Sequence, residues 1–267
     1  MYQIIRYLIV GSLSLALQSF CLASHNRAGE ITYQWMSGYT YKITVVTYTK
    51  ESSPADRCEL EIAWGDDKID TILRVNGLMD SCPPPAADGE LIPGATDVRW
   101  NIYIGYHTYP GPGFYKITMQ DPNRNALVVN MLDSYSTPFF LETTLLIGDS
   151  SLGLDTNSSP ILLNPPIDNA CSGKLFIHNP GASDINGDSI SYILSDCFQS
   201  MDDNGTAIAA EGFYIPNNIT LDPITGDLIW NTPPSVIDIA SGYDEYNICF
   251  EILEWKYGTI IGRVLRD

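Results

Sequence analysis

Short β-prone segments separated by turn residues recur along the chain, and they constrain its fold more than any other feature. Each segment is rich in β-branched and aromatic residues and is bounded by Gly, Pro, Asn, Asp or Ser clusters. The first half holds seven of them, at 30–36, 41–49, 58–64, 101–106, 114–119, 126–132 and 139–147. Residues 41–47 alternate in a period of two, which predicts antiparallel strands with one buried face. No segment has helical periodicity, so the fold class is predicted to be all-β.

A second series of such segments follows a polar run of small residues at 148–160. Two similar halves result, and seven strands in about 125 residues is typical of a sandwich. Tyr115, preceded by Gly113 in a G-x-Y pattern, fits the tyrosine corner of immunoglobulin-like sandwiches, and Tyr246 repeats it in the second half. We therefore predict two tandem Ig-like antiparallel β-sandwich domains, residues 24–150 and 151–267.

The first 23 residues have the pattern of a secretory signal peptide. Arg6 precedes a long apolar run, and small residues allow cleavage after Ala23. A lipoprotein signal at Cys21 is the alternative, but Phe20 stands where that signal needs a small side chain. No later stretch reaches the roughly 20 apolar residues of a membrane span. The sequence thus predicts a secreted or surface-attached protein with no transmembrane segment in the mature chain.

The charge balance excludes one class of partner. Asp and Glu number 32 against 14 Lys and Arg, a formal net charge of −18. Such a field repels phosphate backbones and anionic membranes, so we expect no nucleic-acid partner. It suits divalent cations, although exported surfaces are often acidic without binding any.

Five cysteines follow the predicted signal peptide, an odd number for an oxidising compartment. Proximity in sequence suggests the disulfides Cys58–Cys82 and Cys171–Cys197, which leaves Cys249 over. No CxxC spacing points to zinc.

Asp184, Asn186 and Asp188 place oxygen side chains at alternate positions around a glycine. Calcium takes six to eight oxygen ligands, so these three residues are the candidate metal ligands, and calcium is the one cofactor suggested. Asp155 or Asp168 could complete the shell. The alternative is an Asn-Gly hairpin turn whose aspartates are merely solvated.

No catalytic constellation stands out, and we expect the chain not to be an enzyme. Asp66 and Asp67 are adjacent and would point to opposite faces of a strand, whereas paired-carboxylate catalysis needs two groups on one substrate. His25, His107 and His178 lack metal-ligand spacing. Aromatic residues that could stack on sugar rings gather in the first half, and the Pro-rich stretch 82–94 is either a recognition loop or a stiff connection. The aromatic set is Tyr33, Trp35, Tyr39, Tyr41, Tyr103, Tyr106 and Tyr109.

Two sets of motifs resemble known families. Trp64-Gly65-Asp66 with the later His107-Thr108-Tyr109 resembles the polycystic-kidney-disease (PKD) type of Ig-like domain, although Asp67 replaces the usual second glycine. In the second half, D-I-N-G-D-S-I-S-Y at 184–192 and D-P-I-T-G-D-L-I-W at 222–230 resemble cadherin-like bacterial Ig-like repeats.

Together these motifs are similar to the amino-terminal region of exported gliding-motility-associated surface proteins of the type IX secretion kind. The resemblance implies a non-catalytic cell-surface or adhesion module, a piece of a larger protein whose second domain is truncated at its last strand. Its partner would be a surface polysaccharide or a protein. The alternative is the accessory region of an exported carbohydrate-active or proteolytic enzyme whose catalytic domain lies beyond residue 267.

Overall fold

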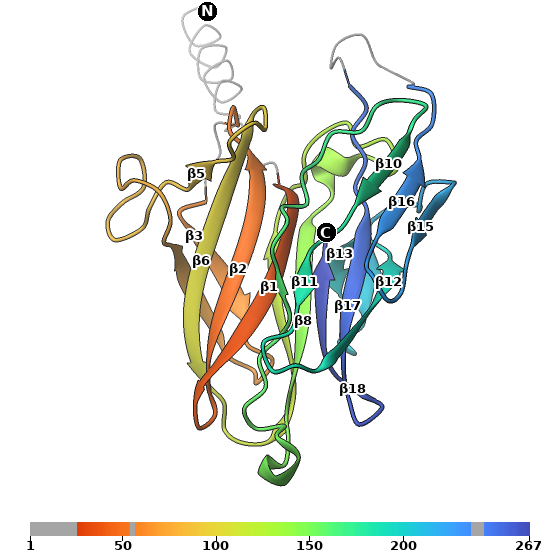
Figure 1. Ribbon diagram of the computed structural model, residues 1–267. Coiled ribbons are helices and arrows are strands. Elements are labelled where there is room, and N and C mark those ends of the chain that lie inside the picture. Colours follow the sequence, from red (N-terminus) through yellow and green to blue (C-terminus); the bar gives the residue numbers. More distant parts are fainter. Residues whose placement is uncertain (1–25, 54–56, 236–242) are drawn as a thin grey trace, which may run out of the picture.

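The computed structural model describes residues 26–53, 57–235 and 243–267. The predicted signal peptide at 1–23 lies outside these ranges, as does His25. Strands dominate the described residues, whose only helical elements are two 3₁₀ turns, η1 (Ser134–Ser136) and η2 (Ser150–Leu152). The all-β prediction is confirmed (Figure 1). A helix long and apolar enough to cross a membrane does not occur in the described part of the chain.

The first half contributes eight strands, most of them at the positions of the predicted β-prone segments. They are β1 (Asn26–Ser37), β2 (Thr40–Lys50), β3 (Glu59–Ala63), β4 (Ile69–Arg74), β5 (Glu90–Leu91), β6 (Val98–Thr108), β7 (Gly113–Asp121) and β8 (Phe139–Ile147).

The second half contributes ten strands, most of them short. They are β9 (Ile161–Leu162), β10 (Leu175–His178), β11 (Ala182–Ser183), β12 (Ser189–Ser195), β13 (Phe198–Met201), β14 (Ala207–Ala209), β15 (Ile219–Leu221), β16 (Leu228–Asn231), β17 (Cys249–Lys256) and β18 (Thr259–Arg266).

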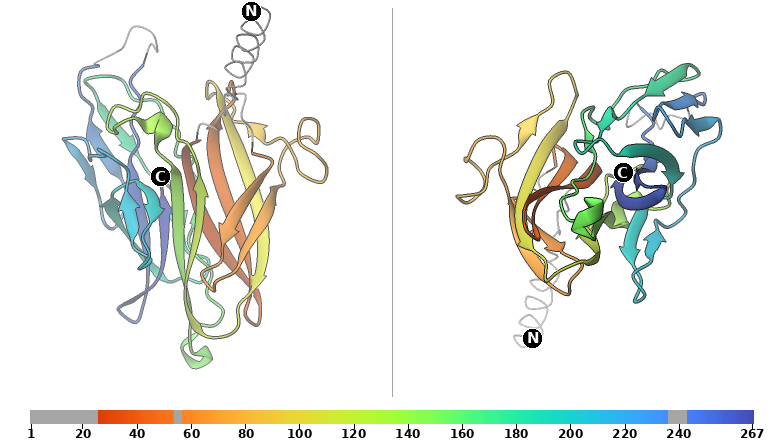
Figure 2. Two further views of the ribbon diagram at one scale, coloured as in Figure 1. Left: turned by 180° about the vertical axis from the view of Figure 1, so that it is seen from behind. Right: turned by 60° about the horizontal axis from the view of Figure 1, so that its bottom comes forward.

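One antiparallel sheet runs through both halves. Its strands follow the order β1-β2-β6-β4-β3-β7-β8-β18-β17-β12, and β5 adds to β6. β18 also meets β1, where Glu30 pairs with Arg266, so the strands from β1 to β8 close into a ring through β18. The last strand of the sequence is therefore hydrogen-bonded to the first half (Figures 1 and 2). This sheet includes strands from both sides of residue 150, so the division into two Ig-like domains at that residue stays a prediction.

Three small sheets flank the extension formed by β17 and β12. β10, β16 and β15 make one, β9 pairs with β11, and β13 pairs with β14. Side chains of the first two sheets, including Phe176 and Leu162, pack on β17, where Phe250 and Ile252 are buried with Tyr192 of β12. The β13–β14 pair lies against β8, and Phe198 of β13 packs with Cys249. The second half thus encloses a smaller core than the first.

The alternation predicted for residues 41–47 is confirmed in β2. Tyr41, Ile43 and Val45 are fully buried, and Thr47 is nearly so, while the residues between them are partly exposed. The buried face packs against β7 and β8, including Ile117. This cluster is the main core of the first half.

The predicted tyrosine corner forms in the first half. The hydroxyl of Tyr115, near the start of β7, donates a hydrogen bond of 2.8 Å to the carbonyl of Gly111. Tyr246 is used differently, because it precedes β17 and its ring packs edge-on against Trp230.

The strand predicted at 126–132 does not form. This segment is a series of turns, with Leu127 in the left-handed region at φ 68°. Val128 and Met131 are buried against residues of the second half, including Cys249. These two side chains fill space between the two halves, and that burial overrides the β propensity of the segment.

The cysteine predictions are half right. Cys58–Cys82 forms as predicted, but Cys197 bonds to Cys249, and Cys171 is an exposed free thiol. The predicted Cys171–Cys197 bond was wrong because proximity in sequence ignores sheet pairing. β12 pairs with β17 so that Ser195 lies opposite Cys249, which brings Cys197 to the same place.

Candidate functional site

The residues predicted to bind calcium lie in the loop between β11 and β12. Asp184 Oδ1 accepts the N–H groups of Asn186 at 2.9 Å and of Asp188 at 2.8 Å, so one of its oxygens holds the turn. Gly187 occupies the left-handed region at φ 80°, which suits glycine because it lacks a Cβ. The loop thus has the tight bend that the spacing predicts.

Asn186, the third residue of the predicted set, uses its side-chain oxygen in a backbone contact. Its Oδ1 accepts the N–H of Ser158 at 2.9 Å. Ser158 belongs to the polar run after β8, so Asn186 fastens the loop to the connection between the halves.

That connection is itself fastened to β1. Two hydrogen bonds join Tyr33 and Ser159. Ser159 N donates to the Tyr33 carbonyl at 2.9 Å, and Tyr33 N donates to the Ser159 hydroxyl oxygen at 2.9 Å. Trp35 N donates to Ser158 Oγ at 3.0 Å. Residues 157–159 therefore lie along β1, between the first half and the 184–188 loop.

Three carboxylates meet where these segments converge. Asp184, Asp188 and Glu254 of β17 each offer an oxygen, and these oxygens lie within 4.8 Å of one another. Glu254 is wholly buried, and the neighbouring Asn157 and Tyr33 are 1% and 3% exposed. We call these five residues the acidic centre.

Several polar atoms of the acidic centre have no hydrogen-bond partner among the described residues. They are both carboxylate oxygens of Glu254, Oδ2 of Asp184, the hydroxyl of Tyr33 and both amide atoms of Asn157. Buried polar groups are normally paired, since leaving one unpaired costs about 1–3 kcal/mol and more for a charge. An orphaned buried set of this kind needs an explanation.

The electrostatics of the acidic centre are strained by like charge. Burial raises the pKa of Glu254 to about 8, and repulsion from Asp184 and Asp188 adds to the rise. The Asn157 amide opposes the rise because it lies near the carboxylate, although the two groups do not reach hydrogen-bonding geometry. Burial and the charge of Glu254 likewise raise the pKa of Tyr33, which keeps its hydroxyl protonated.

Gly262 of β18 faces the acidic centre. A Cβ built on Gly262 would lie 2.5 Å from Glu254 Oε2 and 2.6 Å from the Tyr33 hydroxyl oxygen. Any side chain here would press on both groups, so glycine leaves the space into which they point.

One cation of the chain already reaches the acidic centre. Lys256 Nζ contacts Asp188 Oδ2 at 2.9 Å, and the two side chains are 19% and 10% exposed. Chemically, the arrangement is a set of hard oxygen donors, buried at Glu254 and partly exposed at Asp184 and Asp188, with the Lys256 ammonium in contact with it.

Sequence reasoning found Asp184 and Asp188 but missed Glu254, Asn157 and Tyr33. A clue was present for Glu254, because it continues the alternating face that Phe250 and Ile252 bury. A carboxylate on the apolar face of a strand is a polar group that must find a partner. Asn157 and Tyr33 carried no such clue.

The acidic pair at the W-G-D turn has a structural role. Asp66 Oδ2 contacts His107 Nε2 at 2.9 Å, and the His107 ring stacks on Trp64 with centroids 4.8 Å apart. Asp67 takes φ 64° in the turn. His178 contacts Asp168 at 3.4 Å in the second half, so His107 and His178 are not brought together.

The first-half aromatic residues divide between core and surface. Tyr33, Tyr41, Tyr103 and Tyr109 are buried, whereas Tyr106 is 61% exposed. Most of the set therefore packs the core, and no sugar-stacking platform follows from the sequence list.

Comparison with known proteins gives no relative: no family model matches the chain, and neither a curated protein nor a solved structure matches it.

Proposed function

We propose that this chain is a non-catalytic module of an exported cell-surface or adhesion protein. The observation that carries the proposal is the joining of the two halves by β18, which is hydrogen-bonded to β8, β17 and β1. A strand shared in this way resists relative movement of the halves. Such stiffness suits a protein that presents loops at a distance from a surface.

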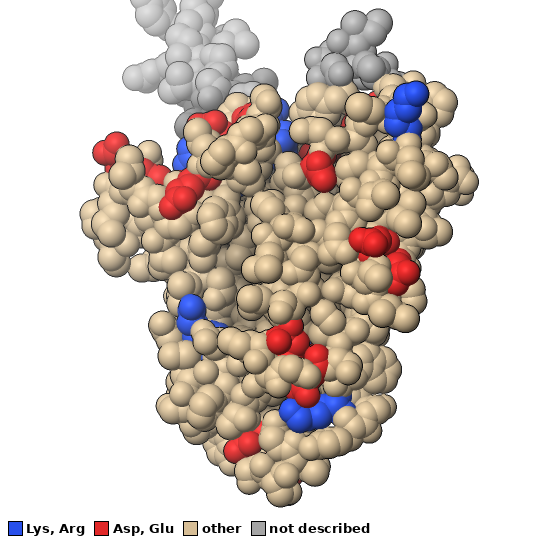
Figure 3. Space-filling view, in the orientation of Figure 1, with Lys and Arg blue, Asp and Glu red and all other residues tan. Residues whose placement is uncertain are grey.

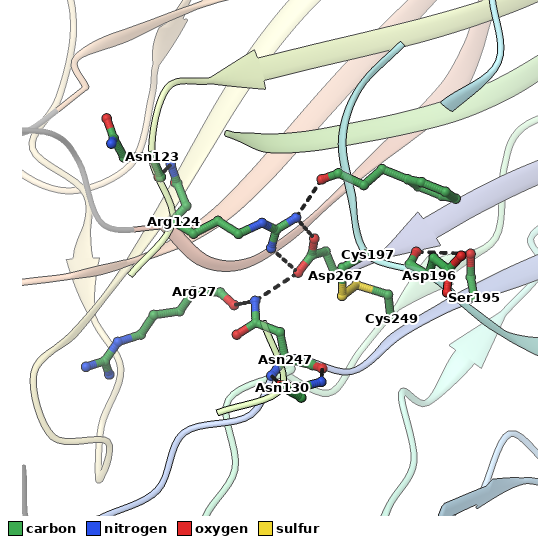
Figure 4. Close-up of polar contacts among 12 residues, drawn as sticks. Arg27, Asn123, Arg124, Asn130, Ser195, Asp196, Cys197, Asn247, Cys249 and Asp267 are labelled. Carbon is green, nitrogen blue, oxygen red and sulfur yellow. Dashed lines mark hydrogen bonds and ion pairs between the residues drawn. A yellow bond between two sulfur atoms is a disulfide. The ribbon is translucent and has the colours of Figure 1, made fainter. Parts of the chain in front are cut away.

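Buried ion pairs support the same role. Arg124 donates to both carboxylate oxygens of Asp267 and to the carbonyl of Phe198, and both charged side chains are fully buried (Figure 4). Arg266 Nη2 lies 2.9 Å from Glu30 Oε1, again in the interior. Each pair joins a residue of the carboxy-terminal strand region to the first half.

A braced loop between β4 and β5 supports a role in presenting a binding surface. Leu78 and Met79 are 74% and 64% exposed, and the loop projects at the left of Figure 1. Large exposed apolar side chains on a fixed loop are typical of partner contacts.

The brace beneath that loop is extensive. Asp88 accepts the backbone N–H groups of Asp80, Ser81 and Cys82, and the Cys58–Cys82 disulfide ties the loop to the sheet. Arg74, fully buried, donates to the carbonyl of Ala87 at 2.6 Å. These contacts fasten to the sheet the loop that carries Leu78 and Met79.

Charge and redox chemistry support export. Two disulfides fit an oxidising compartment. Acidic side chains lie in separate groups over the face shown in Figure 3, among mostly uncharged residues. A net charge of −18 favours solubility and repels anionic polymers.

Surface labelling tests the proposal. Intact cells that produce the chain with its own leader are treated with a membrane-impermeant biotin reagent, and lysed cells serve as the control. We expect labelling in both samples. Labelling only after lysis would contradict export, and hydrolase turnover abolished by one point substitution in the purified chain would contradict the non-catalytic role.

Loop substitution tests adhesion. The double variant Leu78→Ser/Met79→Ser should lose binding to polysaccharides or cells that capture the wild-type chain. Leu175→Ser, at an exposed apolar position on β10, is the matched control and should bind normally. An equal loss of binding in the loop variant and in Leu175→Ser would show that the loop has no specific role in adhesion.

A further inference from the structure

We propose that the acidic centre is a calcium site, with Asp184, Asp188 and Glu254 supplying carboxylate oxygens and Asn157 supplying its amide oxygen. A cation there would stiffen the junction on which the proposed rigid module rests. The ligand set differs from the one that the sequence predicts, because Asn186 is turned toward Ser158.

Clustered acids alone do not make a metal site, since many are simply solvated. Here Glu254 is wholly buried, and neither of its oxygens has a hydrogen-bond partner among the described residues. Asp184 Oδ2 and the amide oxygen of Asn157 are in the same condition. A bound cation would coordinate these four oxygen atoms together.

Charge selects a divalent ion. Asp184, Asp188 and Glu254 carry three negative charges when ionised, and Lys256 contributes one positive charge. The balance of two negative charges matches one divalent cation. Without that cation, the carboxylates repel one another in a buried place, which costs free energy unless one is neutralised.

The donor atoms select calcium among divalent ions. All are hard oxygens, whereas zinc and copper favour nitrogen and sulfur ligands. They come from two carboxylates in one loop, one on β17 and an amide after β8, so they need not form an ideal octahedron. Calcium accepts six to eight oxygens in flexible geometry, but magnesium demands near-ideal octahedral sites and keeps its waters.

The position of the centre explains what the ion would do. It lies between β17 and the 157–159 segment that runs along β1, beneath Gly262 of β18. Binding would tie elements of both halves to one point.

Calcium titration of the purified, chelator-stripped chain tests the proposal. Binding is measured by calorimetry and by the shift in melting temperature, with magnesium and zinc in parallel. We expect a dissociation constant of about 10⁻⁴ to 10⁻³ M, the range of extracellular calcium modules, and a higher melting temperature in calcium than in chelator. No heat and no shift up to 10 mM calcium, a concentration about tenfold above this range, would overturn the proposal. Equal or tighter binding of magnesium or zinc would overturn the choice of ion.

Two substitutions locate the site. Glu254→Gln keeps the shape and removes the charge, and we expect calcium affinity to fall at least tenfold, while circular dichroism and the free-thiol count report an intact fold. Glu251→Gln is the matched control, because Glu251 lies on the same strand and pairs with the exposed Arg263. It should bind calcium normally. Unchanged calcium affinity in Glu254→Gln would place the ion elsewhere and refute the assignment. The surface-labelling experiment tests export separately, so its outcome does not depend on whether calcium binds.

Discussion

Removal of the Asp267 carboxylate should destabilise the protein strongly. In Asp267→Ala, the guanidinium of Arg124 stays fully buried but loses Nη1 and Nη2 contacts to that carboxylate. Asn247 Nδ2 also loses an acceptor at 3.2 Å. The carbonyl of Phe198 and the ring of Phe139 remain beside Arg124, but neither carries a full negative charge.

We expect the free energy of unfolding to fall by about 3–5 kcal/mol, the usual cost of removing one partner of a buried ion pair and leaving the other charge in place. A chain of this size loses roughly 2–4 °C in melting temperature per kcal/mol, so a fall of about 6–20 °C is predicted. Urea unfolding gives the free energy of unfolding, and calorimetry gives the melting temperature.

Two further variants make the measurement decisive. The double variant Arg124→Met/Asp267→Leu removes both charges and should recover much of the lost stability, because apolar replacement of a buried pair is often neutral. Glu251→Ala breaks an exposed pair with Arg263 and should cost less than about 1 kcal/mol. If the free energy of unfolding of Asp267→Ala lies within about 1 kcal/mol of the wild-type value, the Arg124–Asp267 pair does not hold the halves together, and the prediction is wrong.

Three other predictions follow from single residues. Lys256→Met removes the tethered cation from Asp188, so calcium should bind at least threefold more tightly in calorimetry; weaker binding would show that the ammonium does not compete. Burial alone would raise the pKa of Asp66, but the contacts with His107 and Lys68 together outweigh it and hold that pKa below its usual value. The stabilising contribution of Asp66 is complete above the unfolded pKa of about 3.9 and is lost as pH falls through the lower folded pKa. Asp66→Asn should therefore flatten the acidic part of a plot of unfolding free energy against pH. An unchanged plot would contradict the role assigned to the Asp66 carboxylate. Thiol titration of the denatured, unreduced mature chain should find one thiol, and none in Cys171→Ser, whereas a thiol retained in that variant would contradict the Cys197–Cys249 bond.

Local features of the fold could be predicted because they depend on neighbouring residues. Alternation from Tyr41 to Thr47 fixes which side chains are buried on β2, since successive side chains of a strand point to opposite faces. The bond of Tyr115 to Gly111 spans only four residues. The 184–188 loop was predicted for the same reason, because Asp184 and the glycine define its bend within five residues.

Tertiary context overruled local propensity in two places. Residues 126–132 have a strand-like composition, yet Val128 and Met131 fill the space between the halves. Cys197 bonds to a partner 52 residues away and not to the nearer Cys171. In both, the deciding contact comes from a distant strand.

The sequence by itself determined that the chain is all-β, where most of its strands lie, and that two aspartates share one loop. Only the tertiary structure decided that β18 joins both halves and that Glu254, Asn157 and Tyr33 meet those aspartates. The physical reason is that periodicity and turn chemistry act over a few residues. Strand order and register, which bring Tyr33 and Glu254 together across the chain, depend on which buried faces pack best, and no local pattern records that choice.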